Sequence, residues 1–105
     1  MKLCAIADED NKIKILDIHQ LSFINGWAMP RKTINCKTSI DKKKLIISNL
    51  KAITIWEWDG TKVHTIEMDA TFNPNLFISL CSKLIVCDGT GTIIKFHVPE
   101  LNSSS

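Results

Sequence analysis

Three histidines are the first residues of this chain to test for chemistry, because neutral imidazole binds metals and titrates near neutral pH. They are His19, His64 and His97, far apart in the sequence and in no HxxxH spacing. Such an arrangement does not predict a zinc site, which needs ligands at short, regular intervals. We expect these histidines to be structural or solvent-facing, and we expect no bound metal.

The four cysteines also lack the spacing of a metal or redox site, since none forms a CxxC pair. Three of them lie in apolar, strand-like stretches. An unpaired cysteine commonly behaves as a small buried hydrophobic residue, and scattered single cysteines are typical of a reducing compartment. We therefore expect Cys4, Cys36, Cys81 and Cys87 to be buried free thiols.

Two turn-like stretches carry residues that bind ions in other settings. Asp8, Glu9 and Asp10 are consecutive carboxylates, but the glycine and the distal glutamate of an EF-hand loop are missing. The CDGTGT stretch at 87–92 is glycine-rich, yet a strand-like run follows it and not a helix whose N-terminus would hold a phosphate. We expect both stretches to be hairpin turns, with structural roles for Asp10 and Asp88.

Lysines and tryptophans are the remaining candidates for binding. Lys42, Lys43 and Lys44 follow one another in a predicted turn, where their charges would be solvated and could contact a phosphate or an acidic partner. Trp56 is expected to anchor the core. Trp27 follows an Asn-Gly pair near a connector, and it is the residue that we favour for a partner contact, since exposed tryptophan is enriched at interface hot spots.

Motifs and composition argue against several classes of function. The sequence shows no recognisable set of nucleophile, base and orienting group, so we predict a non-enzyme without a cofactor. The 105 residues suit one domain, and their formal charge of +2 predicts no strong binding to nucleic acid or anionic membranes. Apolar runs such as 76–86 are too short to cross a bilayer, and the N-terminus lacks the apolar run of a signal peptide. These features favour the cytoplasm or the nucleus.

A repeat of forty residues organises the chain around these candidates. The runs KIKILDI, AITIWEW and TIIKFHV begin at residues 12, 52 and 92. Ile13, Ile53 and Ile93 occupy the same position in the three runs. A second apolar run precedes each of them, and Asp, Asn or Gly residues join the members of each pair. Two β-rich runs joined in this way predict an antiparallel hairpin.

Strand-like segments in the connectors complete the predicted secondary structure. They lie at 21–29, 32–40, 62–68 and 75–80. No stretch shows helical periodicity with caps, so we predict an all-β fold of antiparallel strands. The runs beginning at residues 12 and 52 carry apolar residues on both faces, so each sheet should be covered on both sides. Four-stranded sheets stacked by repetition are typical of the blades of a β-propeller.

The chain resembles the WD-repeat β-propeller family at the end of each repeat. ADEDNKIKILDI is similar to the end of a WD repeat, with Asp10 at the turn between strands. The three repeats hold LD, WE and FH where the family places Trp-Asp, and the resemblance covers residues 2 to 98. It implies that the following residues shape the blades: Asp10, Leu16, Asp17, Trp56, Glu57, Asp88 and Phe96.

The family pattern is incomplete in every repeat. The Gly-His pair that commonly ends the connector before the first strand of a blade is absent from both connectors. In the family, a buried network links that His to the Trp through a Ser or Thr and the turn Asp. Only Asp10 and Trp56 match members of this network, and they belong to different repeats. Divergent WD repeats and another propeller family with similar blades are both open at this point.

The strand count predicts a partial propeller over residues 1–98. With the strands of a blade lettered a to d, the chain reads b-c-d at about 2–30, a full blade at about 31–68 and a-b-c at about 72–98, before a polar tail at 99–105. We expect a piece of a larger propeller, or a chain that needs a partner, and not a stable isolated monomer. The resemblance implies a scaffold for protein-protein contacts. The alternatives are a propeller with a ligand or catalytic site in its central channel and an RNA- or phospholipid-binding surface.

Overall fold

A computed structural model of the chain describes residues 2–39, 41–49, 51–68 and 74–102. The predicted boundary at residue 72 and the end of the predicted tail, 103–105, lie outside these residues. Within them, strands dominate, and no helix is long and apolar enough to cross a membrane. The prediction of an all-β fold is confirmed.

In the described part of the chain, ten strands form three antiparallel sheets in which neighbours along the chain are neighbours in the sheet. The first sheet contains β1 (Leu3–Ala7), β2 (Lys12–Asp17) and β3 (Ser22–Ala28). The middle sheet contains β4 (Asn35–Thr38), β5 (Leu45–Ser48), β6 (Ala52–Trp56) and β7 (Lys62–Glu67). The third sheet contains β8 (Pro74–Leu80), β9 (Lys83–Asp88) and β10 (Ile93–His97).

The forty-residue repeat is visible in the geometry of the strands as well as in the sequence. The pairing of β2 with β3 shifts register between Ile15 and Leu16, and the pairing of β6 with β7 shifts between Ile55 and Trp56. These two bulges lie forty residues apart. A bulge bends its strand and increases the local twist, so the first and middle sheets bend at equivalent positions.

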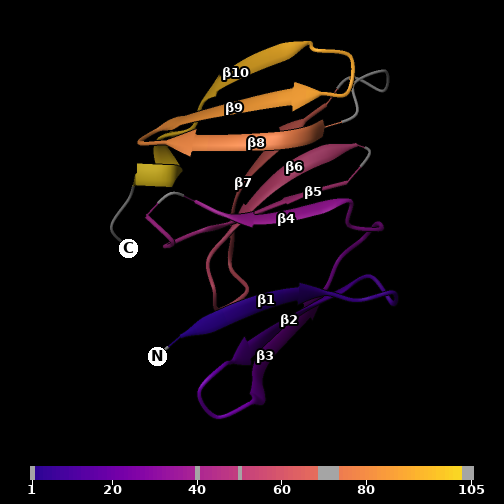
Figure 1. Cartoon of the computed structure of the whole chain (residues 1–105), viewed down its shortest axis with the longest axis vertical. Helices are drawn as coiled ribbons and strands as arrows, with labels where there is room; N and C mark the ends of the chain where they lie inside the picture. Colours follow the sequence, from indigo (N-terminus) through magenta and orange to yellow (C-terminus); the bar gives the residue numbers. More distant parts are fainter. Residues whose placement is uncertain (1, 40, 50, 69–73, 103–105) are drawn as a thin grey trace.

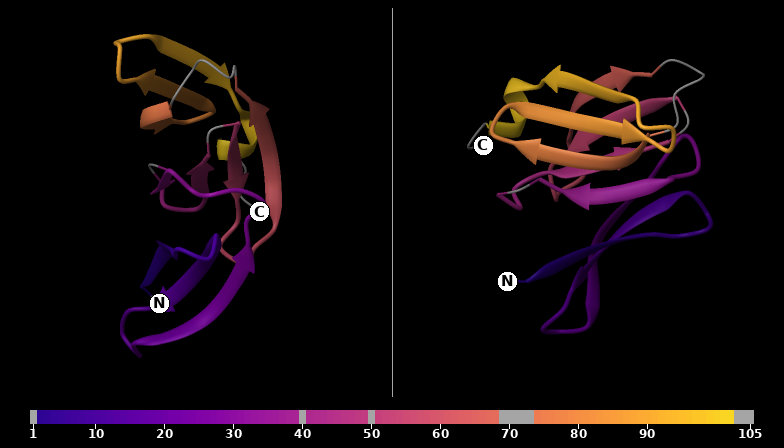
Figure 2. Two further views of the ribbon diagram at one scale, coloured as in Figure 1. Left: turned by 90° about the vertical axis from the view of Figure 1, so that its right-hand side faces the viewer. Right: turned by 45° about the horizontal axis from the view of Figure 1, so that its top comes forward.

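The three sheets are stacked, with the middle sheet between the other two (Figures 1 and 2). One core lies between the middle and third sheets and includes Ile46, Ile55 and Leu84. The other lies between the first and middle sheets and includes Ile13 and Ile47. Because side chains alternate along a strand, neighbouring residues of β5 enter different cores.

The middle sheet is covered on both faces, as the apolar pattern predicted. Every residue of β5 is buried, and so is β6 from Ala52 to Ile55. A half-exposed sheet would show one buried and one exposed residue in turn. The centre of the fold is therefore a sheet enclosed between two others.

The two end sheets each keep one exposed face with apolar side chains on it. In the first sheet, Ile6 and Phe23 lie on the face opposite the core and are 37% and 60% exposed. In the third sheet, Ile78 and Ile93 are 50% and 59% exposed on the outward face. We call these two surfaces the outer faces.

The end of the described chain differs from the predicted polar tail. Pro99–Asn102 forms a short 3-10 helix, η1, and Leu101 is buried in the core between the middle and third sheets. Val98, just before the helix, is buried there as well. A single buried leucine among polar residues gives no periodic signal, so the pattern of the sequence missed this contact.

Candidate functional site

The three histidines lie in separate parts of the fold. His19 is exposed in the turn after β2, and His97 is exposed at the end of β10. His64 lies on β7, where its Nδ1 is 2.7 Å from Oε2 of Glu100 on η1. Among the described residues, no group of three or more His, Cys, Asp or Glu side chains is placed to hold a metal ion.

All four cysteines are free thiols, but they differ in their surroundings. Burial, followed by the nearby Cys4, raises the pKa of the Cys36 thiol on β4 to about 11. A thiol with so high a pKa is protonated at neutral pH and is a poor nucleophile. None of the four is fully buried as expected, since Cys4, Cys36 and Cys87 are half-buried and Cys81 is exposed. Cys81 occupies the turn between β8 and β9 with a left-handed φ of 54°.

The turn after β1 is organised by Asp8, whereas the sequence pattern assigned this role to Asp10. Asp8 Oδ1 accepts hydrogen bonds from the backbone N–H groups of Asp10 and Lys12 at 2.9 and 3.0 Å. The bond from Lys12 is the main cause that lowers the pKa of Asp8. Asp10 is exposed and only donates its amide to this turn. The predicted role of Asp10 is therefore corrected.

In the CDGTGT stretch, the side chain of Asp88 accepts the hydrogen bonds that close the turn between β9 and β10. Asp88 Oδ1 accepts hydrogen bonds from the Thr90 hydroxyl at 2.7 Å and from the amides of Thr90 and Thr92 at 2.9 Å. The Thr90 hydroxyl is the main cause that lowers the pKa of Asp88. Asn49 Oδ1 likewise accepts two backbone amides in the middle hairpin. The three hairpins of the repeat, β1–β2, β5–β6 and β9–β10, are thus each closed by an Asp or Asn side chain, in the manner of Asx turns.

Trp27 lies in the contact between the first and middle sheets, and not on the exposed surface where the prediction placed it. Its ring stacks on that of Trp56, with centroids 5.3 Å apart and planes inclined by 25°. Gly60, at a φ of 96°, permits the approach, since an added Cβ would lie 3.1 Å from Trp27 Cε3. The Asn-Gly pair before Trp27 belongs to β3 itself, so it does not mark a loop.

Trp56 packs against the core between the first and middle sheets. Its Nε1 donates to Thr54 Oγ1 at 2.8 Å, and that hydroxyl donates to the Ile47 carbonyl at 3.1 Å. The indole is therefore fixed by stacking on one side and by a hydrogen-bonded hydroxyl on β6. The position that the sequence marked as an anchor is a packed one.

The other residues of the blade pattern lie in different surroundings. Asp17 is buried, and its Oδ1 accepts the amides of His19 and Gln20 at 3.0 and 3.3 Å. Leu16 is half-buried on the outer face of the first sheet, opposite Cys4 and Phe23. Phe96 packs against the core between the middle and third sheets.

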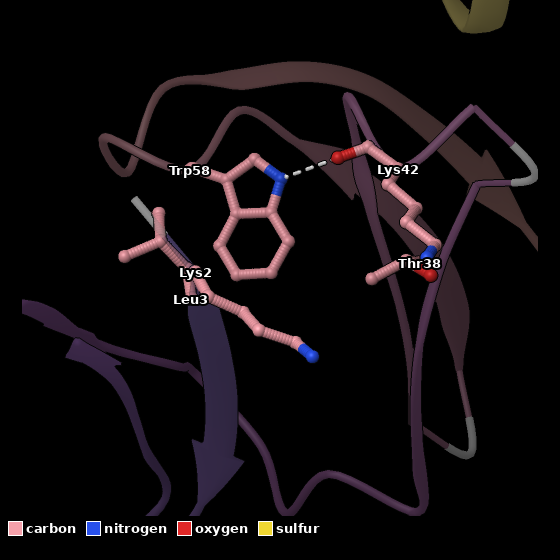
Figure 3. A pocket seen from close by; sticks show the side chains of 5 residues that line it. All are labelled: Lys2, Leu3, Thr38, Lys42 and Trp58. Atoms are coloured by element: carbon pink, nitrogen blue, oxygen red, sulfur yellow. Dashed lines mark hydrogen bonds between the residues drawn. The ribbon is translucent and has the colours of Figure 1, made fainter. Parts of the chain in front are cut away.

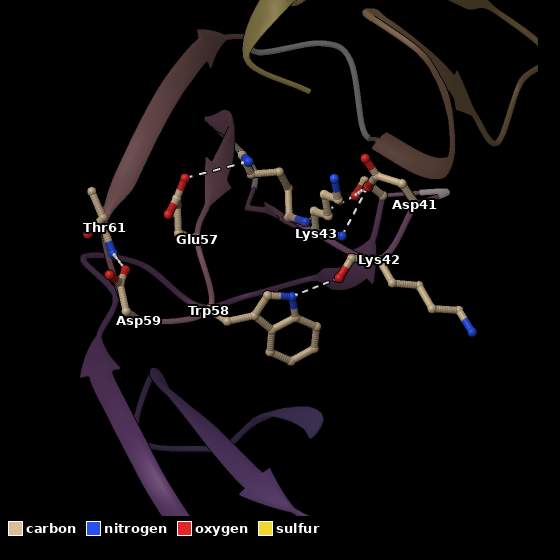
Figure 4. Close-up of polar contacts among 9 residues, drawn as sticks. Asp41, Lys42, Lys43, Glu57, Trp58, Asp59 and Thr61 are labelled. Atoms are coloured by element: carbon tan, nitrogen blue, oxygen red, sulfur yellow. Dashed lines mark hydrogen bonds and ion pairs between the residues drawn. The ribbon is translucent and has the colours of Figure 1, made fainter. Parts of the chain in front are cut away.

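The lysine run separates into two exposed residues and one buried residue. Figure 4 shows Lys42 and Lys43 beside Asp41. Lys42 and Lys43 are exposed in the turn between β4 and β5. Lys44 is only 1% exposed, and its Nζ lies 3.5 Å from Oε1 of Glu57, at the start of the turn after β6. The expectation of a solvated Lys44 is wrong. The residue directly precedes β5, where its amide donates to Ser39 Oγ and its side chain is buried toward the third sheet.

A cavity opens between the first and middle sheets, beside the ring of Trp58 (Figure 3). It measures about 450 Å³ and is lined by Lys2, Leu3, Thr38, Lys42 and Trp58. Trp58 is held at two points, because its Nε1 donates to the Lys42 carbonyl at 3.0 Å and its own carbonyl accepts from Asn25 Nδ2 at 3.3 Å. The lining therefore combines an apolar wall with two lysines.

Sequence patterns single out Lys42 but none of the other residues of this cavity as members of a site. Lys2 precedes β1 and Leu3 begins it, Thr38 ends β4 and Lys42 lies in the turn after it, and Trp58 follows β6. The lining therefore comes from three parts of the chain. No spacing in the sequence indicates that these residues lie close together in the fold. It follows from the stacking of two sheets, which places the edge strands β1 and β4 next to each other (Figure 1).

No protein-family model matches the chain, and no curated protein matches it. The fold and the cavity therefore define it as an antiparallel all-β protein of three stacked sheets with a small basic and apolar cavity between two of them. The likeness to WD repeats is a prediction from the sequence alone.

Proposed function

We propose that this chain is a non-catalytic scaffold for protein-protein contacts and forms part of a larger propeller with WD-like sheets, in the cytoplasm or the nucleus. The observation that carries the proposal is the contrast between the enclosed middle sheet and the two outer faces. The middle sheet is buried on both sides, whereas each end sheet exposes apolar side chains on one side. Contiguous exposed apolar surface marks a site of association.

The same packing rule supports further sheets of this kind on the outer faces. Within the chain, apolar strand residues of one sheet pack on those of the next. The outer faces repeat this type of surface, with Phe23 and Ile93 as their most exposed large residues on the strands. A sheet or partner that covers them would give the end sheets the environment that the middle sheet already has.

Light scattering during size-exclusion chromatography tests the proposal directly. We expect the purified chain to associate as its concentration rises, and Phe23→Ser and Ile93→Ser together to reduce this association. Ile34→Ser is the matched control, because Ile34 is 44% exposed but lies in the connector between β3 and β4. A chain that stays an 11.8 kDa monomer at every concentration would contradict the proposal.

A further inference from the structure

We propose that the edge of β1, together with the cavity beside Trp58, binds an extended peptide segment of a partner protein that carries a large apolar side chain flanked by carboxylates. The inference deepens the proposed scaffold function and rests on it, because it names the kind of partner. It uses a different surface, since neither β1's edge nor the cavity belongs to the outer faces.

The backbone of β1 presents alternate hydrogen-bonding groups to the edge of its sheet. The Lys2 carbonyl accepts the Ile18 amide, and the Asp8 amide donates to the Lys12 carbonyl. These bonds, together with the register of β1 and β2, direct the even-numbered residues of β1 toward β2. The amides and carbonyls of Leu3, Ala5 and Ala7 therefore point outward, and an added strand could bond to them.

The cavity lies where a side chain of such a strand would go. A residue that pairs with Leu3 places its side chain on the same face of the sheet as Leu3, because directly opposite residues share a face. On that face Leu3 contacts the core between the first and middle sheets and lines the cavity. The volume of about 450 Å³ is in the range of ligand pockets and accommodates a large side chain.

The residues that line the cavity indicate which side chains the bound peptide should carry. Trp58 and Leu3 supply an apolar wall, and tryptophan is a frequent anchor of binding energy at interfaces. Lys2 and Lys42 are the charged residues among the lining, the Thr38 hydroxyl can donate a hydrogen bond, and no carboxylate is among the lining residues. Complementary charges on the partner are therefore negative. In an extended segment, the residues two positions before and after the apolar residue face the same side.

A synthetic peptide with the sequence TETFTET, labelled with fluorescein, is the probe for this site. Its phenylalanine and both glutamates lie on one face of the extended chain, and threonine favours the strand conformation. We expect saturable binding in fluorescence polarisation. Substitution of both glutamates by glutamine, giving TQTFTQT, should weaken binding at least about tenfold, which corresponds to about 1.4 kcal/mol.

Two N-methylated forms of the peptide test whether binding is strand addition. One form is methylated on the phenylalanine and glutamate amides, and the other on the threonine amides between them. Only alternate amides of a strand face its neighbour, so one form should lose binding and the other should keep it. Equal behaviour of the two forms would overturn the proposal. This test needs no change in the protein.

Charge reversal at the cavity supplies the matched test on the protein side. We expect Lys2→Glu with Lys42→Glu to weaken binding of TETFTET at least tenfold, whereas Lys62→Glu, at an exposed lysine on β7, should leave it unchanged. Unchanged binding in the cavity variant would overturn the proposal. Where that variant does not fold, Thr38→Trp fills the cavity instead and should block binding.

Failure of this inference can be told apart from failure of the proposed function. The peptide is also measured on the Phe23→Ser, Ile93→Ser variant, which alters the outer faces and leaves the β1 edge intact. Binding to that variant with the same affinity supports a separate edge site. A fall in peptide binding as the chain concentration rises would show that a second copy occupies the edge, and it would overturn the assignment to a partner.

Discussion

Lys44 and Glu57 are the charged residues whose placement depends most on the fold. Lys44 directly precedes β5 and Glu57 directly follows β6, so they continue the register of these strands on the side of the middle sheet that packs against the third sheet. A buried ammonium is costly unless a charge or hydrogen bonds compensate it. The carboxylate of Glu57 provides such a charge, and at 25% exposure it keeps contact with water. The lysine therefore serves the packing of two sheets and not a surface contact.

We expect Lys44→Met to lower the free energy of unfolding by about 1 to 3 kcal/mol, the usual cost of removing one member of a buried charged pair that water can partly replace. Lys44→Ala should cost more, because it also leaves a cavity. Urea denaturation followed by tryptophan fluorescence measures both changes. Lys43→Met, at an exposed neighbour, should stay within about 0.5 kcal/mol of the parent chain. Equal stabilities of the Lys44→Met and Lys43→Met variants would contradict the structural role of the pair.

At the scale of elements, the fold is built from antiparallel hairpins, and those of the repeat are closed by Asx turns. The composition of the strands and turns made these hairpins predictable. Apolar runs of strand length, separated by Asp, Asn and Gly, gave the pairing and the all-β class. The two-sided apolar pattern of β5 and β6 also indicated an enclosed sheet. These features are local or periodic, so a sequence records them directly.

The contacts between elements were not predictable in the same way. An Asn-Gly pair commonly marks a turn and so favours a surface position for Trp27, but here the pair lies within β3 and the ring stacks on Trp56. The polar composition of 99–105 predicts a tail, yet Leu101 is buried against the middle and third sheets. The cavity joins residues of β1, β4 and the turn after β6. Each case depends on how sheets stack, and one sequence has no signal for that geometry.

The short helix η1 should contribute measurably to stability through a single side chain. Leu101 is 2% exposed within the core, and Leu to Ala changes at buried sites cost about 2 to 5 kcal/mol. We expect Leu101→Ala to destabilise the chain by an amount in this range, as measured by urea denaturation. Leu21→Ala is the control, because Leu21 is 77% exposed in a turn and should change stability by less than about 0.5 kcal/mol. Similar values for the two variants would show that η1 does not dock on the core.

At the scale of the whole molecule, stability should fall from the middle sheet outward. The middle sheet is shielded by a sheet on each side, whereas the first and third sheets are shielded on one side (Figure 2). Regions with more buried contacts open less often than regions with fewer. Solvent should therefore reach the end sheets through openings that leave the middle sheet intact.

Hydrogen exchange of the backbone amides measures this gradient residue by residue. We expect the amide of Ile46 on the enclosed strand β5 to exchange only through global unfolding. The amides of Ala5 on β1 and Lys95 on β10 point to the edges of their sheets and should exchange fastest among the strand residues, since neither is directed at a neighbouring strand. Protection of Ala5 and Lys95 equal to that of Ile46 would show that these edges are paired in solution. Protection of Ala5 that rises only when TETFTET is added would place the peptide on the β1 edge, because the outward amides of that strand are the ones that a new neighbour must bond.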